Sequence, residues 1–144
     1  EGVINCFDLI LNDYGPDFYT GSINVEIEDS RSIGEMYPIL HEAQTKIYEK
    51  YNAFLVFGFY SVDVNDERYI KIKSLLKNYK ENERHIINYH GIVIDEKENT
   101  IYCDITRDFD IKSEEVIENV NRILKEEFPK YKIHVNIDTE FAGE

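Results

Sequence analysis

Alternating apolar and polar residues predict a β-hairpin in the first part of the chain. Over residues 19–28 the side chains alternate with the two-residue period of a strand that has one buried face and one wet or docked face. The apolar positions are Ile23, Val25 and Ile27. An apolar segment over residues 3–11 precedes this strand, and Gly15-Pro16 supplies turn chemistry between the two. We therefore predict two strands joined by a turn.

Apolar residues then recur at three- and four-residue steps, which predicts a helix with one buried face. These residues are Ile33, Met36, Leu40, Ala43, Ile47 and Tyr51. Ser32 and Glu35 have the spacing of a capping box at a helix start. Pro38 disfavours a helix interior, so we expect a kink there or a helix that begins near Tyr37. An apolar strand over residues 52–60 completes a ββαβ unit.

The same order of elements returns roughly 80 residues later, which indicates duplication of a small domain. The second set is a hairpin over residues 85–94 and 100–107, a helix from Ser113 to Phe128, and a strand over residues 131–138. The predicted fold class is α+β, with two tandem ferredoxin-like ββαβ modules over residues 1–62 and 83–144. A lysine-rich linker helix over residues 63–82 joins them, and each sheet has helices on one face only.

The first module resembles the cytoplasmic tail domain of cation diffusion facilitator transporters, which export zinc, manganese, iron and similar divalent ions. The resemblance rests on Asp8-Leu9, on Gly15-Pro16 and on residues 23–29 (INVEIED), followed by a helix and an apolar strand. The second module is similar to a more divergent copy. The resemblance implies the tail of an integral membrane protein on the cytoplasmic side of the cell membrane, with membrane-spanning helices ahead of Glu1.

The family resemblance also implies metal ions on the uncovered sheet face, held by histidines on both hairpin strands and at the helix start and by a His-x-Asp on the last strand. In the first module these positions fall on poor ligands: Phe7, Asn24, Tyr37, Gly58 and Tyr60. The first tail site is therefore expected to be largely lost. The rings of Phe7, Tyr37 and Tyr60 are instead expected to form an interface, either in a homodimer or between the two modules of one chain.

The second module has better candidate ligands. Aligning the two copies matches His90 with Phe7 and Tyr102 with Asn24, and it places His134 and Asn136 at Gly58 and Tyr60. The candidate metal ligands are His90, His134, Asp104 and Asp138, because imidazole and carboxylate suit divalent zinc, manganese or iron. The alternative is that the two histidines are ordinary surface residues.

The charge and the cysteine content limit the partners and the compartment that we expect for the chain. The net charge of −13, from 29 acidic and 16 basic residues, argues against a nucleic-acid partner. No segment approaches the roughly 20 apolar residues of a membrane span.

The two cysteines, Cys6 and Cys103, lie in apolar strand contexts without metal-type spacing, so we expect buried free thiols in a reducing compartment.

The chain carries no glycine-rich phosphate loop, nucleophile elbow, zinc-protease motif or EF-hand spacing, so we expect that it is not an enzyme. The expected function is a regulatory and dimerisation domain that acts with the membrane domain of a divalent-cation efflux transporter. The alternative is a free-standing ACT-like small-molecule sensor, which would use a glycine-rich turn between strand and helix. The matching turns are residues 28–34 and 108–114, and only the first contains a glycine.

Overall fold

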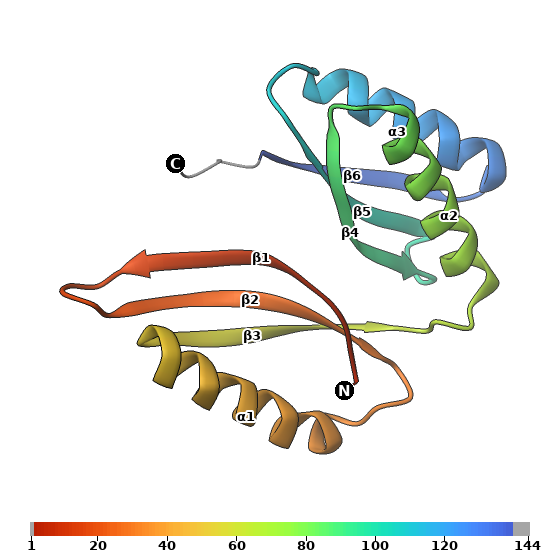
Figure 1. The fold of residues 1–144 in the computed structure, drawn as a ribbon. Helices are drawn as coiled ribbons and strands as arrows, with labels where there is room; N and C mark the ends of the chain where they lie inside the picture. Colours follow the sequence, from red (N-terminus) through yellow and green to blue (C-terminus); the bar gives the residue numbers. More distant parts are fainter. Residues whose placement is uncertain (1, 140–144) are drawn as a thin grey trace. The chain divides into compact units, whose positions relative to one another are not determined.

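The computed structural model describes residues 2–139 and divides the chain into two compact units between Val64 and Asn65 (Figure 1). The first module contains β1 (Val3–Asp13), β2 (Tyr19–Glu28), α1 (Ile33–Tyr51) and β3 (Ala53–Val62). The second contains α2 (Glu67–Asn82), β4 (Ile86–Asp95), β5 (Thr100–Arg107), α3 (Ser113–Glu127) and β6 (Lys132–Thr139). Each module is described separately.

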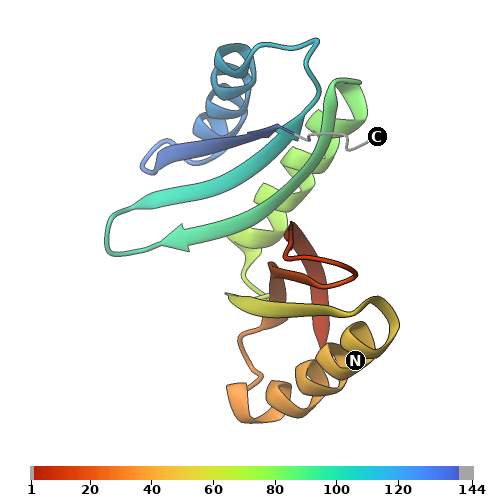
Figure 2. The same cartoon turned by 90° about the vertical axis from the view of Figure 1, so that its left-hand side faces the viewer.

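Both modules have the same sheet topology. In each, the first two strands pair antiparallel and the third pairs parallel with the middle strand, giving the orders β1-β2-β3 and β4-β5-β6. The parallel pairing requires a crossover, which α1 and α3 supply. Figure 2 shows the same repeated arrangement from the side. The α+β fold with a duplicated ββαβ unit is thus confirmed and is consistent with tandem ferredoxin-like modules.

Helix α1 begins at Ile33, four residues before the start expected from Pro38. The capping box accounts for the difference: the Ser32 hydroxyl accepts from the backbone N–H of Glu35 at 3.2 Å, and the Glu35 carboxylate accepts from the backbone N–H of Ser32 at 2.7 Å. These bonds satisfy two donors of the first turn, so the helix is already established when it reaches Pro38. The prediction of a start near Tyr37 is therefore wrong.

The core of the first module lies between α1 and one face of its sheet. It consists of Val25 and Ile27 from β2 with Met36 and Leu40 from α1, and partly buried neighbours complete it. Those neighbours are Val3, Ile39 and Phe57. Because side chains alternate along a strand, Asn24 and its cross-strand partners lie on the opposite face of the sheet from α1.

Helix α2 packs on the second module and is not only a linker, which corrects the predicted role of residues 63–82 (Figure 1). Its buried side chains are Tyr69, Ile72, Leu76 and Tyr79. Asn119 on α3 donates to the Tyr79 hydroxyl at 3.4 Å, and α2 also packs against β4. The sheet of the second module is therefore covered by two helices on one face. None of the helices within residues 2–139 combines the length and apolar character that crossing a bilayer requires.

Asp66 caps α2 and is expected to add stability that depends on pH. Its carboxylate accepts from the backbone N–H and the guanidinium of Arg68, at 2.8 and 2.7 Å, and the hydrogen bonds from Arg68 lower the pKa of Asp66. Asp66→Ala should lower the free energy of unfolding by about 0.5–2 kcal/mol at neutral pH. A carboxylate with a lowered pKa stabilises the folded state fully at pH values above its ordinary pKa of about 3.9. This stabilisation is lost as the pH falls toward the folded-state pKa.

Urea unfolding of the wild type and Asp66→Asn at several pH values separates capping from charge, because asparagine caps about as well as aspartate. We expect the difference in stability between the two proteins to shrink as the pH falls below about 4. A constant difference across that range would contradict the charge contribution of Asp66.

The two cysteines differ in exposure, so the prediction of two buried thiols is correct only for Cys103. Cys103 on β5 is 0% exposed, and burial raises its pKa to about 12, whereas Cys6 on β1 is exposed. Partial burial and the nearby Glu26 carboxylate raise the pKa of Cys6 as well. With an aromatic disulfide reagent we expect one thiol to react in the native protein and the second only on unfolding. Native Cys6→Ser should resist the reagent, and rapid labelling of that variant would contradict the structure.

Candidate metal centre

The sheet face opposite α2 and α3 carries a row of polar residues from the three strands of the second module. On β5, Ile101, Cys103 and Ile105 are buried on the helix side, so Asp104 lies on the opposite face. Asp104 pairs with His90 on β4 and with Asn136 on β6, which places these three residues side by side across the sheet. One strand-pairing row therefore brings an imidazole, a carboxylate and an amide together.

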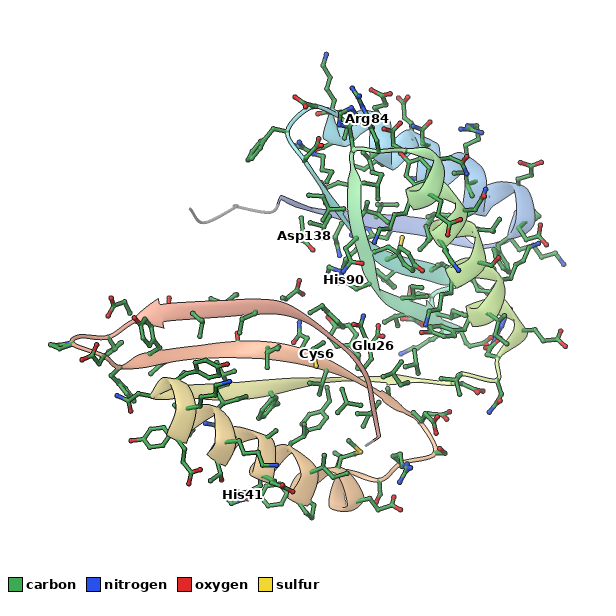
Figure 3. The ribbon with its side chains drawn as sticks, in the orientation of Figure 1. Cys6, Glu26, His41, Arg84, His90 and Asp138 are labelled. Atoms are coloured by element: carbon green, nitrogen blue, oxygen red, sulfur yellow. The ribbon has the colours of Figure 1, made fainter. Side chains whose placement is uncertain are left out.

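His90, Asp104 and Asp138 converge on this face. The His90 Nε2 atom lies 3.3 Å from a carboxylate oxygen of Asp138 and 3.9 Å from one of Asp104. One ligand atom from each residue lies within 4.8 Å of the other two. Figure 3 shows His90 on β4 and Asp138 on β6 next to each other. Ligand atoms around a tetrahedral zinc ion are about 3.4 Å apart, so these three side chains could hold a divalent metal after a small adjustment.

The three side chains are exposed to different degrees. The side chain of His90 is 4% exposed and that of Asp104 is 14% exposed, whereas that of Asp138 is 45% exposed. Asp138 is therefore the most accessible of the three candidate ligands.

A chain of hydrogen bonds orients the Asp104 carboxylate. The Asn136 amide donates to one oxygen of Asp104 at 2.8 Å, and the other oxygen faces His90. His134 Nε2 lies 3.1 Å from the Asn136 side-chain oxygen, to which it donates. His134, predicted as a ligand, therefore lies outside the converging group and supports it through Asn136. Residues in this position fix ligand geometry and commonly affect metal affinity.

Gly91 makes room for the Asp104 carboxylate. Its φ of +62° is favoured by glycine, and a Cβ atom at this position would lie 2.3 Å from an Asp104 oxygen. The strand pairing shifts between His90 and Val93, so Gly91 belongs to a β-bulge. Sequence reasoning missed Gly91, although a glycine inside an apolar strand pattern is the usual signal of a bulge or a close approach.

The observed registers correct the alignment of the two modules. In the first module Phe7 pairs with Asn24 and Asn24 with Gly58, so the counterpart of Asn24 is Asp104 and not Tyr102. The counterparts of Gly58 and Tyr60 are likewise shifted by two residues along β6. The four matched positions in the second module are His90, Asp104, Asn136 and Asp138. The predicted alignment put Tyr102 in place of Asp104, His134 in place of Asn136 and Asn136 in place of Asp138.

The matched positions of the first module have different contacts. The rings of Phe7 and Tyr60 meet edge to face with centroids 4.9 Å apart. The Asn24 amide donates to Asp8 at 3.1 Å, and a side chain at Gly58 would collide with Asn24. Within the described residues of the first module, no three His, Cys, Asp or Glu side chains converge. This face therefore offers rings and amides where the second module offers an imidazole and carboxylates.

Tyr37 does not share a face with the other two predicted interface residues. It is 65% exposed on α1, and α1 packs against the sheet face opposite Phe7 and Tyr60. Its ring lies 5.9 Å from that of His41 on the same helix. The prediction of one aromatic surface built from all three residues is therefore wrong, because it relied on a helix position that faces away from the sheet.

A second group of His85, Asp108 and Asp110 also converges in the second module. His85 donates from Nδ1 to Asp108 at 2.9 Å, and its Nε2 accepts from the Arg84 guanidinium at 3.0 Å. Asp108 also accepts from the backbone N–H of Asp110, and the bond from His85 lowers the pKa of Asp108. Both ring nitrogens of His85 are already bonded to protein groups, so this group is a weaker metal candidate than His90, Asp104 and Asp138.

Comparison of the chain with models of known protein families and with curated proteins finds no match in either set.

Proposed function

We propose that this chain is a cytosolic regulatory and dimerisation domain of a divalent-cation efflux transporter, whose transport step takes place in membrane helices outside the chain. The observation that carries the proposal is the convergence of His90, Asp104 and Asp138 on the uncovered face of a duplicated ββαβ domain. These residues occupy the strand positions at which the resemblance implies tail metal ligands. Zinc, manganese and iron(II) are the candidate ions, because a mixed nitrogen and oxygen site suits them.

The two modules would have different roles. The second would bind the cation, because its face has the imidazole and the carboxylates. The first, with the Phe7 and Tyr60 rings at the matched positions, would serve assembly. A bound ion would join β4, β5 and β6, since each contributes one ligand, and would favour the conformation in which these strands hold the observed register. The cation concentration would then shift the population of transporter states.

A free-standing ACT-like sensor receives less support. Such a domain would bind its ligand at the turn between the second strand and the helix. In the first of these turns the Ser32 and Glu35 side chains bond to backbone N–H groups in a capping box. In the second, the Asp108 carboxylate accepts from His85, which precedes β4. These turns offer a small molecule few polar groups that are not already used by the protein.

The coding sequence ahead of residue 1 tests the proposal without assuming any metal site. The transporter proposal expects several apolar segments of about 20 residues each in the same reading frame. A start codon close to residue 1, or an upstream enzyme domain, would contradict it. A second test is transport of zinc, manganese and iron(II) by the complete polypeptide in vesicles. Asp138→Asn is expected to change the cation concentration at which transport is half-maximal and to leave the maximal rate nearly unchanged.

A further inference from the structure

The helix-side face of the first module contains an apolar groove over β1, which we call the β1 groove. Its main lining residues are Leu9, Leu11, Ile23, Ile47, Tyr51 and Leu55, around a cavity of about 450 Å³. Leu55 is buried, whereas Leu9 is 55% exposed and Leu11 is 50% exposed. Two leucines of one strand are thus left half exposed, where contact with an apolar partner would remove them from water. A contiguous apolar patch of this kind marks a binding surface.

The second module shows what covers the same surface. The registers of the two hairpins match Ile10 with Val93, and therefore Leu9 with Ile92. Ile92 is only 5% exposed, because α2 packs against β4. In the first module α1 corresponds to α3, and among the described residues the first module contains no counterpart of α2. The two modules thus differ by one helix at the position where Leu9 and Leu11 are exposed.

Charge indicates the kind of helix that would fit. Residues 1–64 contain 11 acidic and 3 basic residues. Helix α2, which covers the matching face, contains 5 basic and 2 acidic residues. Its apolar face is formed by Tyr69, Ile72, Leu76 and Tyr79, at the three- and four-residue steps of an amphipathic helix. A helix with the same apolar spacing and a basic polar face would therefore complement the first module in both shape and charge.

We infer that the β1 groove binds a basic amphipathic helix of a partner protein, in the place that α2 holds on the second module. The partner helix would insert apolar residues between β1 and the carboxyl-terminal half of α1, and its basic residues would be attracted by the negative net charge of the first module. The inference does not depend on the proposed transport function, because it rests on the comparison between the two modules.

The probe is a fluorescein-labelled peptide with the sequence of residues 65–83, which reproduces α2 and its cap. It is titrated into the complete, isotope-labelled chain while fluorescence anisotropy and amide chemical shifts are recorded. We expect saturable binding with shifts at Leu9, Leu11 and Ile47. A peptide in which Ile72 and Leu76 are both replaced by aspartate should not bind, because it keeps the lysines and loses the apolar face.

Two substitutions on one strand provide the matched control. Leu11 lines the groove, whereas Ile10 is 56% exposed and pairs with Ser22 on the opposite face of the sheet. Leu11→Asp should weaken peptide binding by about tenfold or more, and Ile10→Asp should leave it within about twofold of wild type. Hydrogen exchange of both variants establishes that the first module remains folded.

Three results would overturn the inference. The first is the absence of peptide-induced shifts in residues 9–11, including shifts confined to β4, which would mean that the peptide displaces α2. The second is an equal loss of affinity in the two aspartate variants. The third is a wild-type dimer in sedimentation that Leu11→Asp converts to a monomer, since a second copy would then cover the groove.

Discussion

Replacing Leu76 by alanine is expected to lower the free energy of unfolding of the second module by about 2–5 kcal/mol. Leu76 is 1% exposed, and it belongs to the buried face of α2, the helix that packs on β4. Removing its side chain would leave a cavity at the centre of this packing. Amide hydrogen exchange is the measurement, because it reports the loss of protection element by element.

The pattern of exchange distinguishes an integral helix from a linker. If α2 is part of the module, Leu76→Ala should also lower the protection of β4 and α3. If α2 were only a linker, protection would fall in α2 alone, and that result would contradict its assignment to the second module. The matched control is Ile70→Ala on the same helix, where the side chain is 52% exposed and the expected loss is below about 1 kcal/mol.

Replacing His90 by alanine is expected to abolish measurable binding of zinc, manganese and iron(II) to the chain. His90 contributes the only imidazole of the converging group, and its Nε2 atom lies within 3.9 Å of both carboxylates. Asp138→Asn is the milder variant, because Asp138 is partly exposed and asparagine preserves its shape. Asn136→Ala, which releases Asp104 from its hydrogen bond, should weaken binding by about 10–100-fold.

Calorimetric titration of each ion measures these affinities. The control is His41→Ala, an exposed histidine on α1 that lies in the other module, and it should leave binding unchanged. Binding that survives His90→Ala, or that is lost with His41→Ala, would place the ion elsewhere. Thermal unfolding with and without the ion serves as a second readout, since a ligand that binds the folded state raises its stability.

The fold could be predicted from the sequence because its signals are local. The two-residue alternation around Val25 and the helical spacing around Leu40 each specify an element and its buried face. The capping box at Ser32 marks the true helix start, and Pro38 lies inside the helix without displacing that start. Whether a helix tolerates proline near its start depends on how well its first turn is already fixed, and here the bonds between Ser32 and Glu35 fix that turn.

The candidate site was predicted less well because strand alternation does not determine register. A shift of two residues along β5 preserves the apolar pattern, so Tyr102 and Asp104 are equivalent choices for the counterpart of Asn24 on pattern alone. The bulge at Gly91 sets the actual register. The sequence nevertheless predicts His90, Asp104 and Asp138, because each lies at an outward-facing position of its strand. His134 also faces outward, but it lies too far along β6 to join these three residues.

Crystals of the chain soaked in zinc and measured at the zinc absorption edge test the cation site most directly. We expect one anomalous peak about 2.0–2.2 Å from His90 Nε2 and from a carboxylate oxygen of each of Asp104 and Asp138. A peak beside His85 and Asp108, or no peak on the uncovered face of the second sheet at millimolar zinc, would contradict the metal centre and the regulatory role built on it.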